Sequence, residues 1–162
     1  MDRKGTKFIA IYEIIGGLLG MAIVLILLYK LFKAYAQFDQ GVFLATLLTC
    51  IIVLSLYIVS FIAGILLWKA KLLGNKLSLF IQALQIPNIS LLGFSYIFVS
   101  GIQLALNISK GLSEDIKFNL FFYLGSKFDI NLFSKESTFL IGVNIIALLI
   151  FIYLKKINKN TV

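Results

Sequence analysis

The first hydrophobic run of the chain contains, at residues 11–20, the stretch IYEIIGGLLG. One carboxylate, Glu13, and three glycines, Gly16, Gly17 and Gly20, stand where a bilayer-spanning helix normally carries bulky apolar side chains. Gly16 and Gly20 are four residues apart, a spacing that allows a second helix to approach closely. Because these glycines share a helix face with Glu13, we expect this face to point into a helix bundle and not toward lipid.

Three further hydrophobic runs follow the first. The chain has 162 residues, 60% of them hydrophobic, and a mean hydropathy of +1.01, whereas soluble domains are roughly half apolar. A helix of about 20 residues crosses ~30 Å of hydrocarbon, and the runs at 8–31, 42–68, 77–108 and 138–154 are close to that length or longer. We therefore predict an all-α membrane protein, in which a single integral membrane domain over 1–162 forms a four-transmembrane-helix bundle.

The predicted external loop at 109–137 joins helices 3 and 4. Apolar and polar residues alternate in it at 116–120 and again at 127–132, with Gly125 and Ser126 between the two segments as a turn signal. This pattern predicts a small external β-hairpin. An amphipathic helix lying at the membrane surface is the alternative for this loop.

The net charge of +8 is unevenly distributed. Three segments carry nine basic residues against one acid, whereas the other two loops carry six against five. The positive-inside rule then places both termini and the 69–76 loop in the cytoplasm of a multi-pass protein, which we assign to a bacterial inner membrane. Lipid headgroups, and not nucleic acid, are the expected partners of the basic residues, which in the three segments are Arg3, Lys4, Lys7, Lys69, Lys71, Lys76, Lys155, Lys156 and Lys159.

An intramembrane polar cluster is predicted around Glu13. Gln82 and Gln85, three residues apart on helix 3, enter at a comparable depth, and Asn88 follows them. A carboxylate in hydrocarbon needs hydrogen-bond donors, and these amides are the best available. The cluster can handle a proton or cation, or it can simply join the helices; we favour the second interpretation because the four runs contain no other acid.

Further positions are predicted to shape the bundle. Pro87 is expected to kink helix 3, because proline lacks an N–H and clashes with the preceding turn. Gln103 of helix 3 and Asn144 of helix 4 are expected to form an outer polar pair. Ser60 and Gly64 form a second pair of small residues for helix packing, beside Gly16, Gly17 and Gly20.

Several residue types needed for catalysis are absent. The sequence has no histidine, and its single cysteine, Cys50, lies within the second hydrophobic run. Without histidine, the commonest general base and metal ligand are missing, so we expect no enzymatic activity, cofactor or metal site. The leading hypothesis is a non-enzymatic accessory or scaffold subunit that binds a membrane-protein partner or a second copy through its helix faces and external loop. The alternative is a small transporter or channel subunit using Glu13, Gln82 and Gln85.

Overall fold

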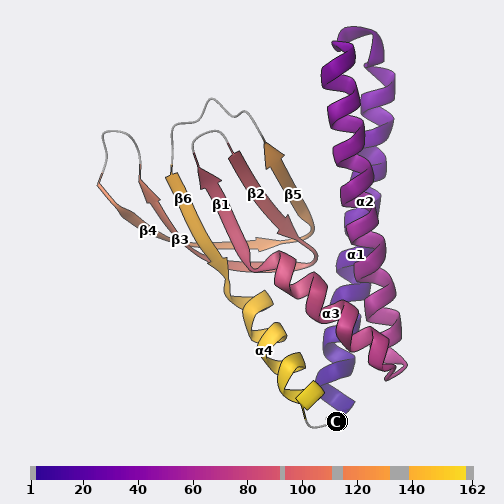
Figure 1. Cartoon of the computed structure of the whole chain (residues 1–162), viewed down its shortest axis with the longest axis vertical. Helices are drawn as coiled ribbons and strands as arrows, with labels where there is room; N and C mark the ends of the chain where they lie inside the picture. The colour runs from indigo at the N-terminus through magenta and orange to yellow at the C-terminus, as the bar shows by residue number, and fades with distance from the viewer. Residues whose placement is uncertain (1–2, 92–93, 111–114, 132–138, 160–162) are drawn as a thin grey trace.

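The computed structural model describes residues 3–91, 94–110, 115–131 and 139–159. Within them lie four α-helices, a short 3-10 helix and a six-stranded sheet (Figure 1). The predicted all-α four-helix bundle is therefore wrong, and the fold is mixed α/β. The elements are α1 (Arg3–Lys33), η1 (Tyr35–Gln37), α2 (Gln40–Trp68), α3 (Leu72–Gln85), β1 (Pro87–Leu91), β2 (Phe94–Val99), β3 (Ile102–Lys110), β4 (Lys117–Leu124), β5 (Lys127–Asn131), β6 (Phe139–Asn144) and α4 (Ile145–Lys159).

The first two hydrophobic runs form α1 and α2, a long antiparallel hairpin (Figure 1). Among the described residues, these are the two helices long and apolar enough to cross a membrane. Asp39 caps the start of α2 by accepting a 2.8 Å hydrogen bond from the backbone N–H of Gly41. At the other end of the hairpin, the Lys7 ammonium lies 5.4 Å from the centre of the Trp68 ring. The beginning of α1 and the end of α2 are therefore in contact.

The third hydrophobic run is not a kinked membrane helix. It contains most of α3, which ends at Gln85, and then the strands β1, β2 and most of β3. Pro87 stops the helix, since it has no N–H to donate, and it becomes the first residue of β1. The residues that follow are rich in β-branched and aromatic side chains, which favour strands once the helix has ended.

The fourth hydrophobic run is also divided. Its first part, Phe139–Asn144, is the strand β6, and its second part forms α4. Asn144 stands at the junction, where its side-chain Oδ1 lies 3.5 Å from the backbone N–H of Ala147 in the first turn of α4. Asparagine at this position is a common helix cap. Hydropathy alone does not separate a buried strand from a membrane helix, which explains both errors.

All strand pairs of the sheet are antiparallel, in the order β4-β3-β6-β1-β2-β5. β2 and β3 are consecutive in the chain but do not pair; the chain turns a corner between them at Ser100 and Gly101. β4 and β5 turn a second corner at Gly125, whose N–H donates a 2.6 Å hydrogen bond to the Gly101 carbonyl. Both glycines have positive φ, 111° and 128°, which glycine adopts readily. The sheet is consequently bent, and β3 and β4 run across below β1 and β2 (Figure 1).

The predicted external hairpin is corrected by this topology. Both alternating segments are strands, β4 and β5, and the turn residues lie between them. The two strands do not pair with each other: β4 pairs with β3 at one edge of the sheet, and β5 pairs with β2 at the other. Within the predicted loop at 109–137, residues 111–114 and 132–137 lie outside the described part of the chain.

The two faces of the sheet differ in polarity. Side chains of directly paired residues lie on the same face, so the register separates an apolar outer face from a more polar inner face. The outer face carries Lys110 at the end of β3 and is otherwise made of Pro87, Ile89, Leu91, Phe94, Tyr96, Phe98, Ile102, Leu104, Leu106, Ile108, Phe118, Leu120, Phe122, Leu124, Phe128, Ile130, Phe139, Ile141 and Val143. The inner face includes Asn88, Ser90, Ser95, Gln103, Asn107, Ser109, Asn119, Asp129 and Asn144.

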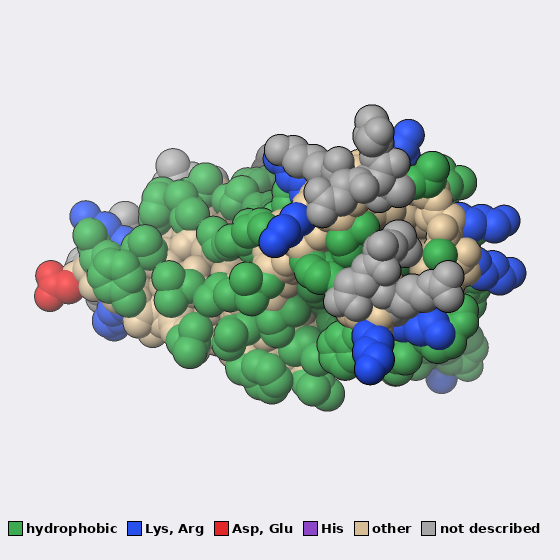
Figure 2. All heavy atoms as spheres, turned by 90° about the horizontal axis from the view of Figure 1, so that it is seen from below, with side chains coloured by type: hydrophobic (Ala, Val, Ile, Leu, Met, Phe, Trp, Pro, Cys, Tyr) green, Lys and Arg blue, Asp and Glu red, His purple; other side chains and the backbone are tan. Residues whose placement is uncertain are grey.

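The helical hairpin covers only one end of the outer face. Phe98 of β2 is fully buried against Tyr57 of α2, with ring centres 5.2 Å apart, and Phe128 of β5 packs against Phe98. On β4, β6 and the second half of β3, by contrast, the outer face is exposed; Leu120 and Ile141 are 66% and 43% accessible. Seen from below, the molecule carries a broad spread of hydrophobic side chains with basic groups at both ends (Figure 2).

The sheet register makes a direct prediction. Ile108 of β3 lies opposite Ile141 of β6 on the outer face, and opposed residues have Cα atoms about 4.5–5.5 Å apart, which suits a disulfide. In a Cys50→Ser background, the pair Ile108→Cys and Ile141→Cys should form an intramolecular disulfide on mild oxidation, measured by mass spectrometry of peptides. The matched pair Ile108→Cys and Leu140→Cys, whose side chains lie on opposite faces, should stay reduced. Equal oxidation of both pairs would contradict the register.

Candidate functional site

A buried polar junction lies where α1, α2 and α3 meet the β2–β3 corner. Each of its side chains is completely inaccessible to solvent. The sequence places them on four separate elements, and the fold brings them together. The members are Glu13 of α1, Ser60 of α2, Ser78, Gln82 and Gln85 of α3, and Ser100 at the corner.

Glu13 links α1 to α3 through both of its carboxylate oxygens. The Ser78 hydroxyl donates to Oε2 over 2.6 Å, and the Gln82 side-chain N–H donates to Oε1 over 3.0 Å. Ser78 and Gln82 are four residues apart and so project from the same face of α3. Both donors are neutral, and Glu13 is buried without a charged partner among its described hydrogen bonds. The arrangement satisfies both oxygens of the carboxylate by hydrogen bonding.

Gln85, one turn further along α3, contacts the sheet corner and not Glu13. Its side-chain Oε1 accepts a 2.8 Å hydrogen bond from the backbone N–H of Ser100. The Ser100 hydroxyl is in turn 3.0 Å from the hydroxyl of Ser60 on α2. Ser100 of the corner is thereby hydrogen-bonded to both α2 and α3.

Two tyrosines complete the attachment of the corner to the hairpin. The Tyr12 hydroxyl donates to the carbonyl of Ile102 over 3.1 Å and accepts from its N–H over 3.3 Å. The Tyr57 hydroxyl donates to the carbonyl of Val99 over 3.1 Å. At the second corner, the Ser126 hydroxyl donates a 2.7 Å bond to the carbonyl of Gly16. The two tyrosines thereby bond backbone groups beside the first corner, and Ser126 joins the second corner to the backbone of α1.

The predicted packing glycines all lie in close contacts inside the chain. A Cβ at Gly16 would lie 2.6 Å from the Ser100 backbone, so this glycine lets the corner approach α1. Gly17 and Gly20 face α2, at Phe61 and Tyr57, and Gly64 faces α1, at Ala10 and Ile14. The Ser60 hydroxyl faces Ser100. These surfaces are occupied by internal packing.

Asn88, predicted to lie beside Glu13, belongs to a separate amide cluster on the inner face of the sheet. Its Oδ1 accepts a 2.9 Å hydrogen bond from the Gln103 side chain, and its Nδ2 lies 3.4 Å from the Oδ1 of Asn107. Asn88 and Asn107 are on β1 and β3, which flank β6, and they meet above Gly142. A side chain at Gly142 would collide with the Asn107 amide. Gly142 therefore allows the side chains of Asn88 and Asn107 to come into contact.

The predicted outer pair of Gln103 and Asn144 is arranged differently in the structure. The two residues lie on the same face of neighbouring strands, β3 and β6, but their described hydrogen bonds go elsewhere. Asn144 accepts from the backbone N–H of Leu104 over 3.3 Å and caps α4. Its role is local, at the strand-to-helix junction.

Two atoms of the polar junction have no hydrogen-bond partner among the described residues: the Oε1 of Gln82 and the Nε2 of Gln85. They belong to side chains one turn apart on the same face of α3. Buried polar atoms are usually paired, so this is the part of the junction where a further small polar group could bind. Within the described residues, no group of three or more His, Cys, Asp or Glu side chains could hold a metal ion.

Four residues of the junction and its attachment were not among the predicted site residues: Ser78, Ser100, Tyr12 and Tyr57. The two tyrosines bond the corner backbone. Ser78 could have been found, because it lies four residues before Gln82 and seven before Gln85 on one helix face. Ser100 carried no such signal, since its position depends on the corner. No family model, curated protein or solved structure matches the chain.

Gly16→Ala should separate the corner from α1. The added methyl group would lie 2.6 Å from the carbonyl carbon and oxygen of Ser100, and backbone atoms cannot swing aside as a flexible side chain can. We expect a loss of about 1–3 kcal/mol in unfolding free energy, the usual cost of overpacking, measured by denaturation in detergent micelles. The control is Gly41→Ala, where the nearest atom is the flexible Asp39 side chain at 3.1 Å. Equal losses in the two variants would contradict the close approach.

Glu13 should tolerate its amide isostere but not an apolar residue. In Glu13→Gln, an oxygen remains as acceptor, and rotation of the Gln82 amide can offer its unpaired Oε1 to the new N–H. We expect a change of less than about 1 kcal/mol in unfolding free energy, the size of one neutral hydrogen bond. Glu13→Leu leaves Ser78 and Gln82 buried without their partner, at about 1–3 kcal/mol each. Thermal unfolding in detergent compares the two, and similar losses would show that the hydrogen bonds do not join α1 to α3.

Proposed function

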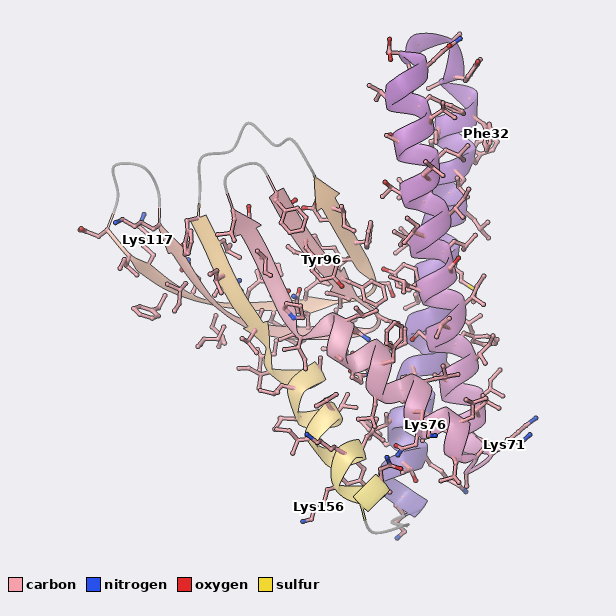
Figure 3. All side chains as sticks on the ribbon, in the orientation of Figure 1. Phe32, Lys71, Lys76, Tyr96, Lys117 and Lys156 are labelled. Carbon is pink, nitrogen blue, oxygen red and sulfur yellow. The ribbon has the colours of Figure 1, made fainter. Side chains whose placement is uncertain are left out.

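We propose that this protein is a membrane-embedded, non-enzymatic accessory subunit that works by binding another protein in the bilayer. In this proposal α1 and α2 cross the inner membrane, so the chain is multi-pass. Lys71 and Lys76 lie at the same end of the molecule as Lys156, whereas Phe32 lies at the opposite end (Figure 3). Lys30 and Lys33 lie at the Phe32 end, in the last turn of α1. The first end carries more basic residues, and this excess favours a cytoplasmic location for it and with it for both termini.

The observation that carries the proposal is the uncovered part of the outer face. The α1–α2 hairpin buries the outer face at Phe98, while on β3, β4 and β6 the same face continues without a described cover. Exposed and contiguous apolar surfaces of this kind mark protein or membrane contacts. The packing glycines, by contrast, are already in contact within the chain. The contact surface we propose is therefore the sheet.

The polar junction supports a structural role over chemistry. Its hydroxyl and amide groups bond Glu13 and the corner backbone, and all six of its side chains are inaccessible. A catalytic group has to reach a substrate, whereas these groups join elements. Nucleic acid is not among the partners we propose, because the basic groups are explained by lipid headgroups.

A second candidate function, a small transporter or channel subunit, is favoured by one observation. The unpaired Oε1 of Gln82 and Nε2 of Gln85 lie near a buried carboxylate, as would suit a site that exchanges a proton or small cation. In that case Glu13→Gln would abolish pH-dependent flux into reconstituted vesicles while the protein stays folded.

Capture of the partner tests the leading proposal. The tagged full chain would be crosslinked in native membranes, solubilised in mild detergent and purified, in parallel with two variants. The double variant Leu106→Asn and Leu120→Asn replaces two opposed outer-face residues of β3 and β4. It should abolish recovery of the crosslinked species, since polar side chains weaken an apolar contact. Glu13→Gln is the control and should recover it unchanged. Substitutions are preferred to deletion of the loop, because deletion would remove β4 and β5.

Two outcomes would contradict the proposal. If wild-type protein is recovered only as a monomer after crosslinking, the outer face does not serve as a protein contact. If Glu13→Gln loses pH-dependent flux that the wild type shows, the transporter function replaces the accessory one.

A further inference from the structure

The edge strand β4 is unusual on this surface because it is exposed on both faces. Among the described residues it pairs only with β3, so its second edge has unpaired backbone N–H and carbonyl groups. On the outer face Phe118 and Leu124 are each 71% accessible, and on the inner face Phe121 is 43% accessible. The other edge strand, β5, packs Phe128 into the cluster that holds Val53 and Tyr57 of α2. Of the two edge strands in the described sheet, β4 is therefore the one that presents an open edge with apolar side chains on both sides.

Neither water nor lipid solvates such an edge completely. Water would satisfy the backbone groups but leave the aromatic side chains exposed, and hydrocarbon would do the reverse, at a cost of several kcal/mol for each unsatisfied group. A partner strand that carries apolar side chains would pair the backbone groups of the β4 edge and also cover its aromatic side chains. Soluble edge strands are commonly protected by charges, proline or a bulge, whereas β4 has a single charged residue, Lys117, at its first position.

The sequence of β4 is complementary to itself. In an antiparallel pair related by a two-fold axis perpendicular to the sheet, each residue keeps its face. With the axis at Leu120, the two Leu120 side chains meet on the outer face, and Phe118 of each copy lies opposite Phe122 of the other. On the inner face Lys117 then lies opposite Tyr123, and Asn119 lies opposite Phe121. The two Lys117 residues are held at opposite ends of the pair, while the outer face of the pair is apolar and aromatic, which is favourable across strands.

We propose that β4 is a homodimerisation strand, which pairs antiparallel with β4 of a second copy and joins the two sheets. This inference rests on the proposed function, since it names the partner at the sheet. A second copy is favoured over a different protein because this one strand supplies both halves of a matched apolar interface. The closed two-fold arrangement also leaves neither β4 edge unpaired.

Disulfide scanning of the full chain tests the pairing. In a Cys50→Ser background, single cysteines at each position from 117 to 124 would be oxidised in phosphatidylcholine vesicles, and dimers would be measured on non-reducing gels. We expect one maximum, at or next to Leu120→Cys, with yields that fall toward both ends of the strand. Ile141→Cys is the control: it lies on the same face but on the interior strand β6, and it should stay monomeric. Co-reconstituted Phe118→Cys and Phe122→Cys chains should crosslink to each other more than either does to itself.

A charge variant provides a second measurement. Leu120→Lys would place two ammonium groups opposite each other at the axis and should convert the detergent-solubilised dimer to monomer, measured by light scattering. Ile141→Lys, with its charge on the same apolar face, should leave the dimer intact. Equal crosslinking at all β4 positions and at Ile141, no crosslinking anywhere, or a dimer that survives Leu120→Lys would each overturn the inference. If these fail while wild-type chain still captures another protein that the outer-face variant loses, the proposed function stands without the dimer.

Discussion

The attachment of the β2–β3 corner to the helical hairpin is the constraint on which the rest of the structure depends. Ser100 is held by Gln85 and Ser60, and the flanking residues Val99 and Ile102 are held by Tyr57 and Tyr12. A corner interrupts the ladder of a sheet, and buried backbone groups left unpaired there would be costly. Because the helices supply the missing partners, the sheet can bend at this point. The bend turns the β2–β5 end of the outer face against α2 and leaves the β3–β4–β6 end uncovered.

The sequence was sufficient to predict the two long helices and the two strands that flank Gly125, but not how the strands pair. The third hydrophobic run was misinterpreted because apolar content is equally compatible with a membrane helix and a buried strand. A signal was nevertheless present. From Ile102 to Ser109, large apolar residues alternate with small or polar ones, which is the period of a strand and not of a helix. Pairing between β1 and β6, about fifty residues apart in the chain, has no such local signature.

The candidate site was partly accessible from the sequence. A buried carboxylate needs donors, and this requirement pointed from Glu13 to the amides of α3, one of which, Gln82, donates to it. The same reasoning failed for Asn88, because Pro87 ends the helix and carries Asn88 into the sheet, where it meets Gln103 and Asn107. Ser60, Gly16 and Gly64 were expected at helix contacts; that Gly16 and Ser60 contact a sheet corner could not be foreseen while the corner itself was unknown.

The third hydrophobic run folds as α3 followed by strands held on the hairpin, and not as a membrane helix. Backbone chemical shifts from NMR of the full chain in lipid nanodiscs measure this directly, residue by residue. We expect helical shifts over Leu72–Gln85, then extended shifts over Pro87–Leu91, Phe94–Val99 and Ile102–Lys110, broken at Gly101. Uninterrupted helical shifts from 77 to 108 would contradict it.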